Sequence, residues 1–203
     1  MCIRDRSARG RLGELIKGPN SDFYVKLKWA DDGKESGRQR QMCIRDRPLK
    51  LPLQSPFEGE QLDLAHQQLD PGYVLLLSWW LTTEFSAAIE VVAIGANPIT
   101  SEGGATLLET IKTSKLKAID IGKPLPLQEP YESDSLDLSN AEMDPGHVLL
   151  LSWWLTTEFS AAIARLILNE NPLTGGEWND VDKDITGVTS LFDTLKTSSV
   201  TEL

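Results

Sequence analysis

Apolar and polar residues recur in a short pattern over residues 59–203. An apolar residue is followed by two others, then by an apolar-x-apolar triplet, and often by an asparagine and a further apolar residue. The frame is cleanest from Ile163 to Leu173 and recurs from Ile89 to Ile99. An alternating triplet is typical of a short β-strand whose two apolar side chains lie on one face. The pattern therefore predicts strands around residues 62–64, 92–94, 119–121, 136–138 and 166–168, and the start of another copy at 200–203.

Helices are predicted between these strands. The dipeptides Asp70-Pro71 and Asp144-Pro145 fit a helix N-cap followed by a first turn, because an Asp side chain accepts backbone N–H groups and proline tolerates the first helical position. Val188, Leu191 and Leu195 recur at helical spacing. The alternation of strand, turn, helix and turn predicts an α/β architecture.

One step between strands is too short for a full helix. Leu62, Val92, Ile119, Leu136 and Leu166 are separated by 30, 27, 17 and 30 residues. The 17-residue step contains two prolines within residues 122–127, so we expect an extended, proline-shaped crossover and a local irregularity there.

The region also contains a long internal duplication. Residues 70–89 match residues 144–163 at nineteen of twenty positions, and the single difference is Tyr73 against His147. The offset is 74 residues, and it becomes 84 after ten extra residues in the second copy. Two explanations of the near-identity stay open: a recent duplication, or an error of sequence assembly.

On these residues the segment 59–203 resembles the leucine-rich repeat family, in its long-repeat, ribonuclease-inhibitor-like subtype. The resemblance implies an α/β solenoid with short parallel strands on a concave face and helices on a convex face. We expect it to be irregular at the short step and truncated at Leu203, where a strand pattern is cut off. The asparagines at positions 97 and 171 are expected to satisfy backbone groups at the turns and to stack with their neighbours as a ladder.

Two basic segments have a different character. Residues 1–6, Met-Cys-Ile-Arg-Asp-Arg, recur letter for letter at 42–47, after Arg-Gln-Arg-Gln at 38–41. Residues 38–47 resemble a translated sequencing adapter, and a genuine basic repeat is the less economical explanation. We therefore leave residues 1–6 and 38–47 out of the fold prediction. Both cysteines, Cys2 and Cys43, go with them, so they indicate nothing about disulfides or metal binding.

The segment 7–37 lies between these two stretches. Phe23–Trp29 alternates apolar with polar or amphipathic residues, which predicts a half-buried strand flanked by turns at 18–20 and 31–33. A β-hairpin fragment that faintly resembles an SH3-like barrel is expected. About 30 residues cannot bury a core of their own. The predicted organisation is thus 7–37 as a hairpin fragment and 48–203 as the solenoid.

The net charge of the chain excludes some classes of binding partner. The chain has 20 Lys and Arg against 30 Asp and Glu, a net charge of −10, which argues against nucleic-acid binding. Residues 48–203 hold 8 basic and 23 acidic residues, a net of 8 − 23 = −15. The longest apolar runs, such as Val74–Leu77, are far below the roughly 20 residues of a membrane span. The sequence leaves localisation open.

Candidate binding residues follow from the strand pattern. On a leucine-rich scaffold the residues that alternate with the core positions face the concave surface. These are Gln61, Asp63, Val91, Ala93, Ala118, Asp120, Ser135, Asp137, Arg165 and Ile167. The sites selected from them for partner binding are Gln61, Asp63, Asp120, Ser135, Asp137, Arg165 and Ile167. Three aspartates share one column, which favours a basic partner; the alternative is that they are solvated polar positions.

Other candidates are weaker. The pairs Trp79-Trp80 and Trp153-Trp154 lie in predicted helices, so one member of each is expected in the core and the other partly exposed, with an aromatic binding anchor as the alternative. Residues 180–184 place carboxylates at alternate positions, as calcium loops do, but Ile185 replaces the required glycine and Leu191 the bidentate glutamate, so an acidic exposed loop is favoured. No metal site and no cofactor are predicted.

The predicted function is a non-catalytic scaffold that binds a protein partner on the concave face. His66 and His147 lie at non-equivalent repeat positions, and no nucleophile elbow, phosphate loop or zinc spacing occurs, so we expect no enzyme activity from these residues. Two alternatives stay open: the regulatory or targeting arm of a larger enzyme, and a structural or surface repeat protein.

Overall fold

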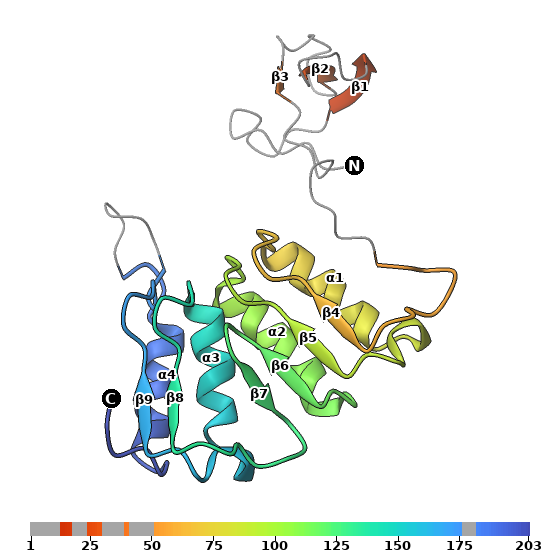
Figure 1. Cartoon of the computed structure of the whole chain (residues 1–203). Coiled ribbons are helices and arrows are strands. Elements are labelled where there is room, and N and C mark those ends of the chain that lie inside the picture. The colour runs from red at the N-terminus through yellow and green to blue at the C-terminus, as the bar shows by residue number, and fades with distance from the viewer. Residues whose placement is uncertain (1–12, 18–23, 30–38, 41–50, 176–181) are drawn as a thin grey trace. The chain divides into compact units, whose positions relative to one another are not determined.

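The computed structural model describes residues 13–17, 24–29, 39–40, 51–175 and 182–203. The chain divides into two units, residues 1–48 and residues 49–203 (Figure 1). In the first unit, β1 (Gly13–Lys17), β2 (Tyr24–Trp29) and β3 (Gln39–Arg40) form a three-stranded antiparallel sheet in the order β1-β2-β3. The strand predicted at Phe23–Trp29 is confirmed as β2, and its predicted flanking turns lie outside the described residues.

The third strand of this unit differs from the sequence prediction. Gln39–Arg40 pair with Val25 and Tyr24, although both belong to the segment that resembles adapter sequence. A strand edge presents unpaired backbone N–H and C=O groups to any extended neighbour, so pairing of two residues does not require a particular side-chain pattern.

The second unit is a mixed α/β structure built from strands of three residues and four helices. Its strands are β4 (Gln61–Asp63), β5 (Val91–Ala93), β6 (Ala118–Asp120), β7 (Pro124–Pro126), β8 (Ser135–Asp137) and β9 (Arg165–Ile167). Its helices are α1 (Pro71–Leu81), α2 (Thr100–Thr113), α3 (Pro145–Trp154) and α4 (Thr186–Leu195), with 3₁₀ turns η3 (Glu84–Ser86) and η4 (Glu158–Ser160). The strands lie in one layer and the helices in another behind it (Figure 1).

Most strands of this layer are parallel. β4, β5 and β6 pair in parallel, so that Leu62, Val92 and Ile119 lie side by side in register. β8 and β9 form a second parallel pair, with Leu136 beside Leu166. A parallel bridge joins Arg165 to Glu202, at the position that Ala118 holds beside Val91 in the first copy. The predicted short parallel strands are thereby confirmed.

The proline-containing crossover is extended, as predicted, but its pairing was not foreseen. β7 runs antiparallel to β6, with Leu125 opposite Ile119, and it ends the four-stranded sheet β4-β5-β6-β7. Pro124 and Pro126 have no N–H group, which restricts such a strand to the edge of a sheet. The edge of β6 is therefore occupied, and β8 begins a separate sheet.

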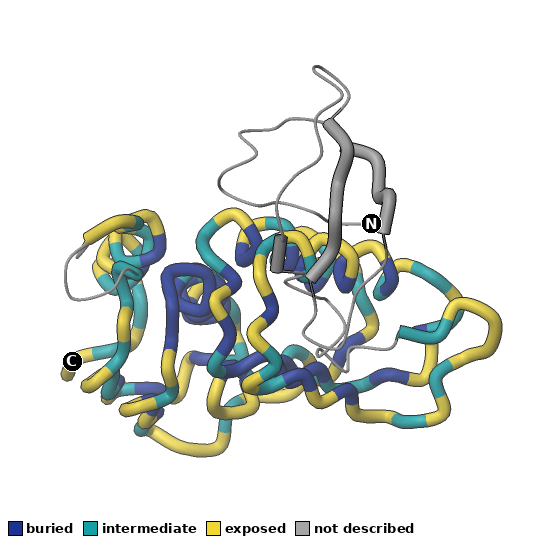
Figure 2. The backbone as a smooth tube through the Cα atoms, turned by 90° about the horizontal axis from the view of Figure 1, so that it is seen from above, coloured by how far each residue is buried: buried dark blue, intermediate teal, exposed yellow. Residues whose placement is uncertain are grey.

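The core lies between the two layers. Each strand buries its central residue and exposes or half-exposes most residues on either side, and the inward face of each helix completes the contact (Figure 2). Trp80 and Trp154 are fully buried, whereas Trp79 is 55% exposed and Trp153 is half-buried. The prediction of one core tryptophan in each pair is confirmed. Each buried indole donates from Nε1 to a proline carbonyl, Trp80 to Pro52 at 2.8 Å and Trp154 to Pro126 at 2.7 Å.

Consecutive helices pack side by side at glycines. Gly103 of α2 lies against Val74 of α1, Gly104 of α2 lies against Gly146 of α3, and Gly187 of α4 lies against the Pro145 carbonyl of α3. A Cβ at Gly104 would come within 2.7 Å of the Gly146 Cα. Gly104 and Gly187 permit a close backbone approach that no larger residue allows, whereas a Cβ at Gly103 would make ordinary van der Waals contact.

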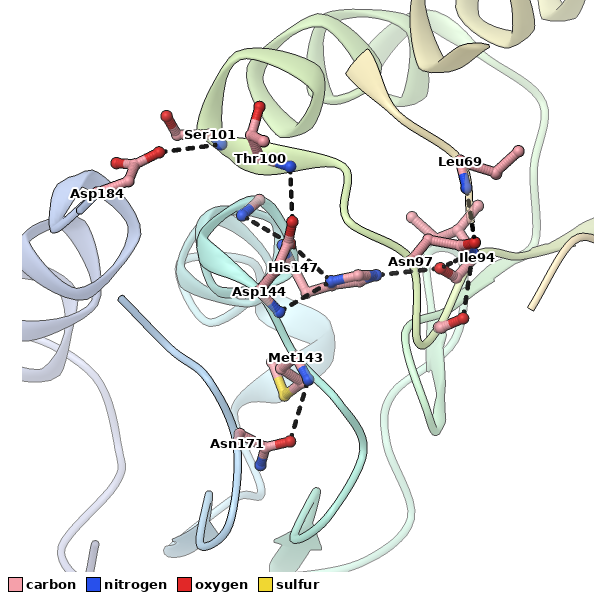
Figure 3. Close-up of polar contacts among 12 residues, drawn as sticks. Leu69, Ile94, Asn97, Thr100, Ser101, Met143, Asp144, His147, Asn171 and Asp184 are labelled. Atoms are coloured by element: carbon pink, nitrogen blue, oxygen red, sulfur yellow. Dashed lines mark hydrogen bonds and ion pairs between the residues drawn. The ribbon is translucent and has the colours of Figure 1, made fainter. Parts of the chain in front are cut away.

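Two asparagines satisfy backbone groups at the turns, as predicted, but no hydrogen bond joins them into the expected ladder among the described residues. Asn97 is 2% exposed; its amide donates to the carbonyls of Leu64 (2.8 Å) and Ile94 (2.6 Å), and its oxygen accepts the Leu69 N–H (3.0 Å). Asn171 repeats the arrangement: its amide donates to the Leu138 carbonyl, and its oxygen accepts the Met143 N–H, a bond that Figure 3 shows. Each asparagine bonds to the backbone of the preceding unit.

Two aspartates bridge helix N-termini. Asp144 accepts the Gly146 N–H at 3.0 Å to cap α3, and its second oxygen accepts the Thr100 N–H at 2.6 Å, at the start of α2. Asp184 accepts the Thr186 N–H of α4 in the same manner, and its second oxygen accepts the Ser101 N–H of α2 (Figure 3). Negative charge is stabilised at a helix N-terminus, so each carboxylate stabilises two helices. The prediction of Asp70 and Asp144 as N-caps is confirmed.

Candidate functional site

The residues predicted to bind a partner lie on the outward side of the strand layer, which we call the strand face. Gln61, Asp63, Asp137 and Arg165 are exposed, and Asp120, Ser135 and Ile167 are half-buried. Of the wider column of alternating positions, Val91 and Ala118 are half-buried. Ala93 is an exception: it is 6% exposed and offers little surface to a partner, because its methyl group lies between longer neighbours on β4 and β6.

Strand register brings only part of this set together. Asp63 of β4 and Asp120 of β6 flank Ala93 at the same level of the sheet, about 10 Å apart at the usual strand spacing. Asp137 lies opposite Ile167 in the second sheet. β7, the edge strand of the first sheet, lies between β6 and β8 (Figure 1), so the predicted single column is interrupted.

Each of the three strand-face aspartates has a local structural role. One carboxylate oxygen accepts the backbone N–H two residues later, at 3.0 Å for Asp63, 2.8 Å for Asp120 and 2.9 Å for Asp137. This is an Asx turn, in which the side chain imitates a backbone turn and ends the strand. The same turn recurs at three strand ends, so a requirement of the fold explains the column as well as a binding role does.

Asp137 is the most strongly stabilised of these anions. The Ser139 hydroxyl donates to its Oδ1 at 2.6 Å and the Ser139 N–H donates to the same atom. These hydrogen bonds, with a smaller contribution from the positive charge of Lys123, lower the pKa of the Asp137 carboxyl below its ordinary value. Asp137 is therefore ionised at neutral pH.

The strand face also includes an ion pair that the sequence prediction missed. Arg165 Nε donates to Glu202 Oε2 at 2.6 Å, and this hydrogen bond raises the pKa of Arg165. Glu202 was not selected, although the 84-residue offset aligns it with Ala118, which belongs to the predicted column. The positive charge of Arg165 is thus offset by a neighbouring carboxylate.

A shallow groove of about 350 Å³ opens at the carboxyl ends of β4, β5 and β6. Asp63, Asp120 and Glu142 contribute carboxylates to its lining, together with His66 and Asn140. His66, Asn140 and Glu142 adopt positive φ angles of 57°, 53° and 51°. These turns place their side chains beside the carboxyl ends of the strands. The residues are far apart in the sequence, so their common groove becomes visible only in the folded structure.

The acidic loop at 180–184 is only partly described, since residues 180 and 181 lie outside the described residues. The Asp184 carboxylate accepts hydrogen bonds from the backbone N–H groups of Ser101 and Thr186. Partial burial opposes ionisation of this group, but the hydrogen bonds prevail and lower its pKa. Across the described part of the chain, no group of three or more His, Cys, Asp or Glu side chains is arranged to hold a metal ion.

No helix in the described residues is both long enough and apolar enough to cross a membrane. A scan against models of known protein families finds no match, and a search of curated proteins finds none.

Proposed function

We propose that residues 51–203 form a leucine-rich-repeat-type solenoid that binds a protein partner with a basic surface on its strand face. The observation that carries the proposal is the common outward placement of the residues flanking each buried strand centre. They make two groups of accessible side chains, one on β4 and β6 and one on β8 and β9, on the outward side of the packed strand layer. A preorganised surface loses little conformational entropy on binding.

Charge on this face favours a basic partner. Asp63, Asp120 and Glu142 line one groove, and Asp137 adds a further carboxylate on β8. Lys123 acts on Asp137 as a nearby positive charge, whereas Arg165 on β9 is paired with Glu202, so the carboxylates of this face outnumber its uncompensated cations. Unbalanced negative charge on one surface attracts a partner of opposite sign and speeds its association.

The repeat interpretation has independent support within the second unit. The two copies use equivalent residues for equivalent contacts: Asn97 and Asn171 at the turns, and Trp80 and Trp154 on proline carbonyls. The helices pack in chain order, α1 on α2, α2 on α3 and α3 on α4, and such stacking of neighbouring units is typical of repeat proteins.

The test separates charge from structure. Asp63→Asn, Asp120→Asn and Asp137→Asn together remove three charges, and each new amide oxygen still accepts the Asx-turn N–H. A fluorescein-labelled deca-lysine peptide serves as the basic probe, and fluorescence anisotropy gives its Kd. Because exposed charge pairs each contribute modestly, we expect the triple variant to bind roughly tenfold more weakly. Binding of the parent chain should weaken as salt is raised.

A matched control removes the same charge elsewhere. The control variant combines Glu84→Gln, Glu102→Gln and Glu158→Gln. The three glutamates are exposed and lie in the first turns of η3, α2 and η4, away from the strand face. This triple should leave the Kd nearly unchanged. Equal weakening by both triples would show that the probe senses only net charge, and the strand-face assignment would be wrong.

A further inference from the structure

Helix α1 carries an exposed apolar face whose counterpart in α3 is covered. Leu75, Leu76 and Trp79 are 59%, 56% and 55% exposed. At the equivalent positions of α3, Leu150 is 1% exposed, and Leu149 and Trp153 are half-buried. The two helices differ at a single residue, so the difference in exposure comes from their neighbours and not from their own sequence.

The neighbours of α3 identify what covers the equivalent face. α3 packs against α2 and α4, whereas α1 packs against α2 alone among the described helices. The contact of α3 with α2 is centred on Gly146, where a Cβ would meet the Thr100 carbonyl oxygen and would approach Ile99 Cγ1 to 2.6 Å. In α3, glycine is therefore required by the backbone of α2.

Gly72 is the equivalent glycine of α1, and no helix among the described residues requires it. It is exposed, and a Cβ there would meet only the Asp70 carboxylate, at 3.3 Å. A glycine in a helix costs stability relative to alanine. The residue fits a helix that approaches α1 as closely as α2 approaches α3.

An extended segment beside α1 shows the same asymmetry. Leu51 and Pro52 correspond to Leu125 and Pro126 of β7. The Pro52 carbonyl accepts a hydrogen bond from the Trp80 indole, just as the Pro126 carbonyl accepts one from Trp154. Leu125 pairs with Ile119 of β6 and is fully buried, whereas Leu51 is half-buried and pairs with no strand among the described residues. A helix like α2 and a strand like β6 are consecutive in the chain, so one unit would supply both.

We infer that a further unit of this protein's own repeat type packs against one surface of α1. The surface is formed by Gly72, Leu75, Leu76 and Trp79, together with the adjoining Leu51-Pro52 segment. The occupant is equivalent to residues 91–122. Its α2-like helix packs on Gly72, and its β6-like strand pairs with the segment at 51–52. The surface is distinct from the strand face, so it leaves that face available to a partner.

The test supplies this unit within the chain. A copy of residues 91–122 is inserted directly before Leu49, where the 74-residue offset places it in the register that residues 91–122 hold before Lys123. We expect a stronger helical signal in far-ultraviolet circular dichroism and a higher thermal midpoint. The fluorescence of Trp79 should also become protected from quenching by acrylamide. In each chain, the Trp79 signal is the difference between the parent and its Trp79→Phe variant.

Gly72→Ala gives the decisive comparison. In the 203-residue chain it should leave the thermal midpoint unchanged or raise it, whereas in the extended chain it should lower the midpoint, as Gly146→Ala lowers that of the 203-residue chain. An inserted unit that stays unfolded, or a folded one that leaves both Gly72→Ala and Trp79 unaffected, overturns the inference. So does a dimer of the 203-residue chain that Leu76→Asp dissociates, because a second copy would then cover this face.

Discussion

Replacement of Asn97 by alanine tests whether buried amides hold successive repeat units together. Asn97 is 2% exposed, and it joins the turn after β5 to the Leu64 carbonyl and the Leu69 N–H of the preceding unit. Asn97→Ala leaves both groups buried without this partner. At about 1–3 kcal/mol for each unsatisfied buried group, with partial recovery by water, the free energy of unfolding should fall by about 2–4 kcal/mol.

For a domain of 150–250 residues, a loss of this size corresponds to a thermal midpoint lower by roughly 5–15 °C. Circular dichroism at 222 nm measures the midpoint, and urea unfolding gives the free energy independently. Asn171→Ala is the matched control. It removes the same contacts from a half-buried site, where water replaces them more readily, so its effect should be smaller.

Asn97→Asp sharpens the test because the shape is kept. A carboxylate can still accept the Leu69 N–H, but it faces the carbonyls of Leu64 and Ile94 without a hydrogen to donate. At pH 7 this variant should be at least as unstable as Asn97→Ala, and it should regain stability when acid protonates the carboxyl group. A midpoint within about 2 °C of the parent for both variants would refute the reasoning, since unsatisfied buried groups of this kind should cost more.

Three further outcomes are expected. Trp80→Phe removes the indole donor to Pro52 from a fully buried site and should lower the thermal midpoint, whereas the exposed Trp79→Phe should change it little. The Asp184 carboxyl has a lowered pKa in the folded state, so its stabilising effect is complete above the unfolded value of about 3.9 and is lost as pH falls through the folded pKa. The difference in stability between the parent and Asp184→Asn should therefore close on acidification. A difference that is constant with pH would contradict the assignment. Ser139→Ala removes the hydroxyl donor and should raise the pKa of Asp137 toward its ordinary value, as measured by carboxyl NMR titration; an unchanged titration would show that the backbone N–H suffices.

Sequence periodicity predicted much of the local structure. The positions of β4, β5, β6, β8 and β9, the N-caps of α1 and α3, and the burial of one tryptophan in each pair all followed from patterns within a few residues. Such features depend on side-chain alternation and on hydrogen bonds between near neighbours, so the local sequence is sufficient to specify them.

The candidate site was predicted less completely. The seven positions selected for partner binding are exposed or half-buried, and their binding role stays a prediction. The pairing of Arg165 with Glu202 and the contribution of His66 and Glu142 to the groove were missed. The Asx turns of the three aspartates were also missed, although an aspartate at the end of each strand was a readable signal for a turn.

The tertiary structure decided which segments meet. Nothing local indicates that β7 turns back along β6, that Asp144 and Asp184 each serve two helices, or that Gly146 is required while Gly72 is not. Almost the same twenty residues occur in both copies, yet their exposure differs, because burial depends on the neighbouring units. Alternation along the chain was enough to predict most of the strands and helices. The sheet break, the shared helix caps and the exposed face of α1 arise only when these elements pack together, because they depend on contacts between residues far apart in the chain.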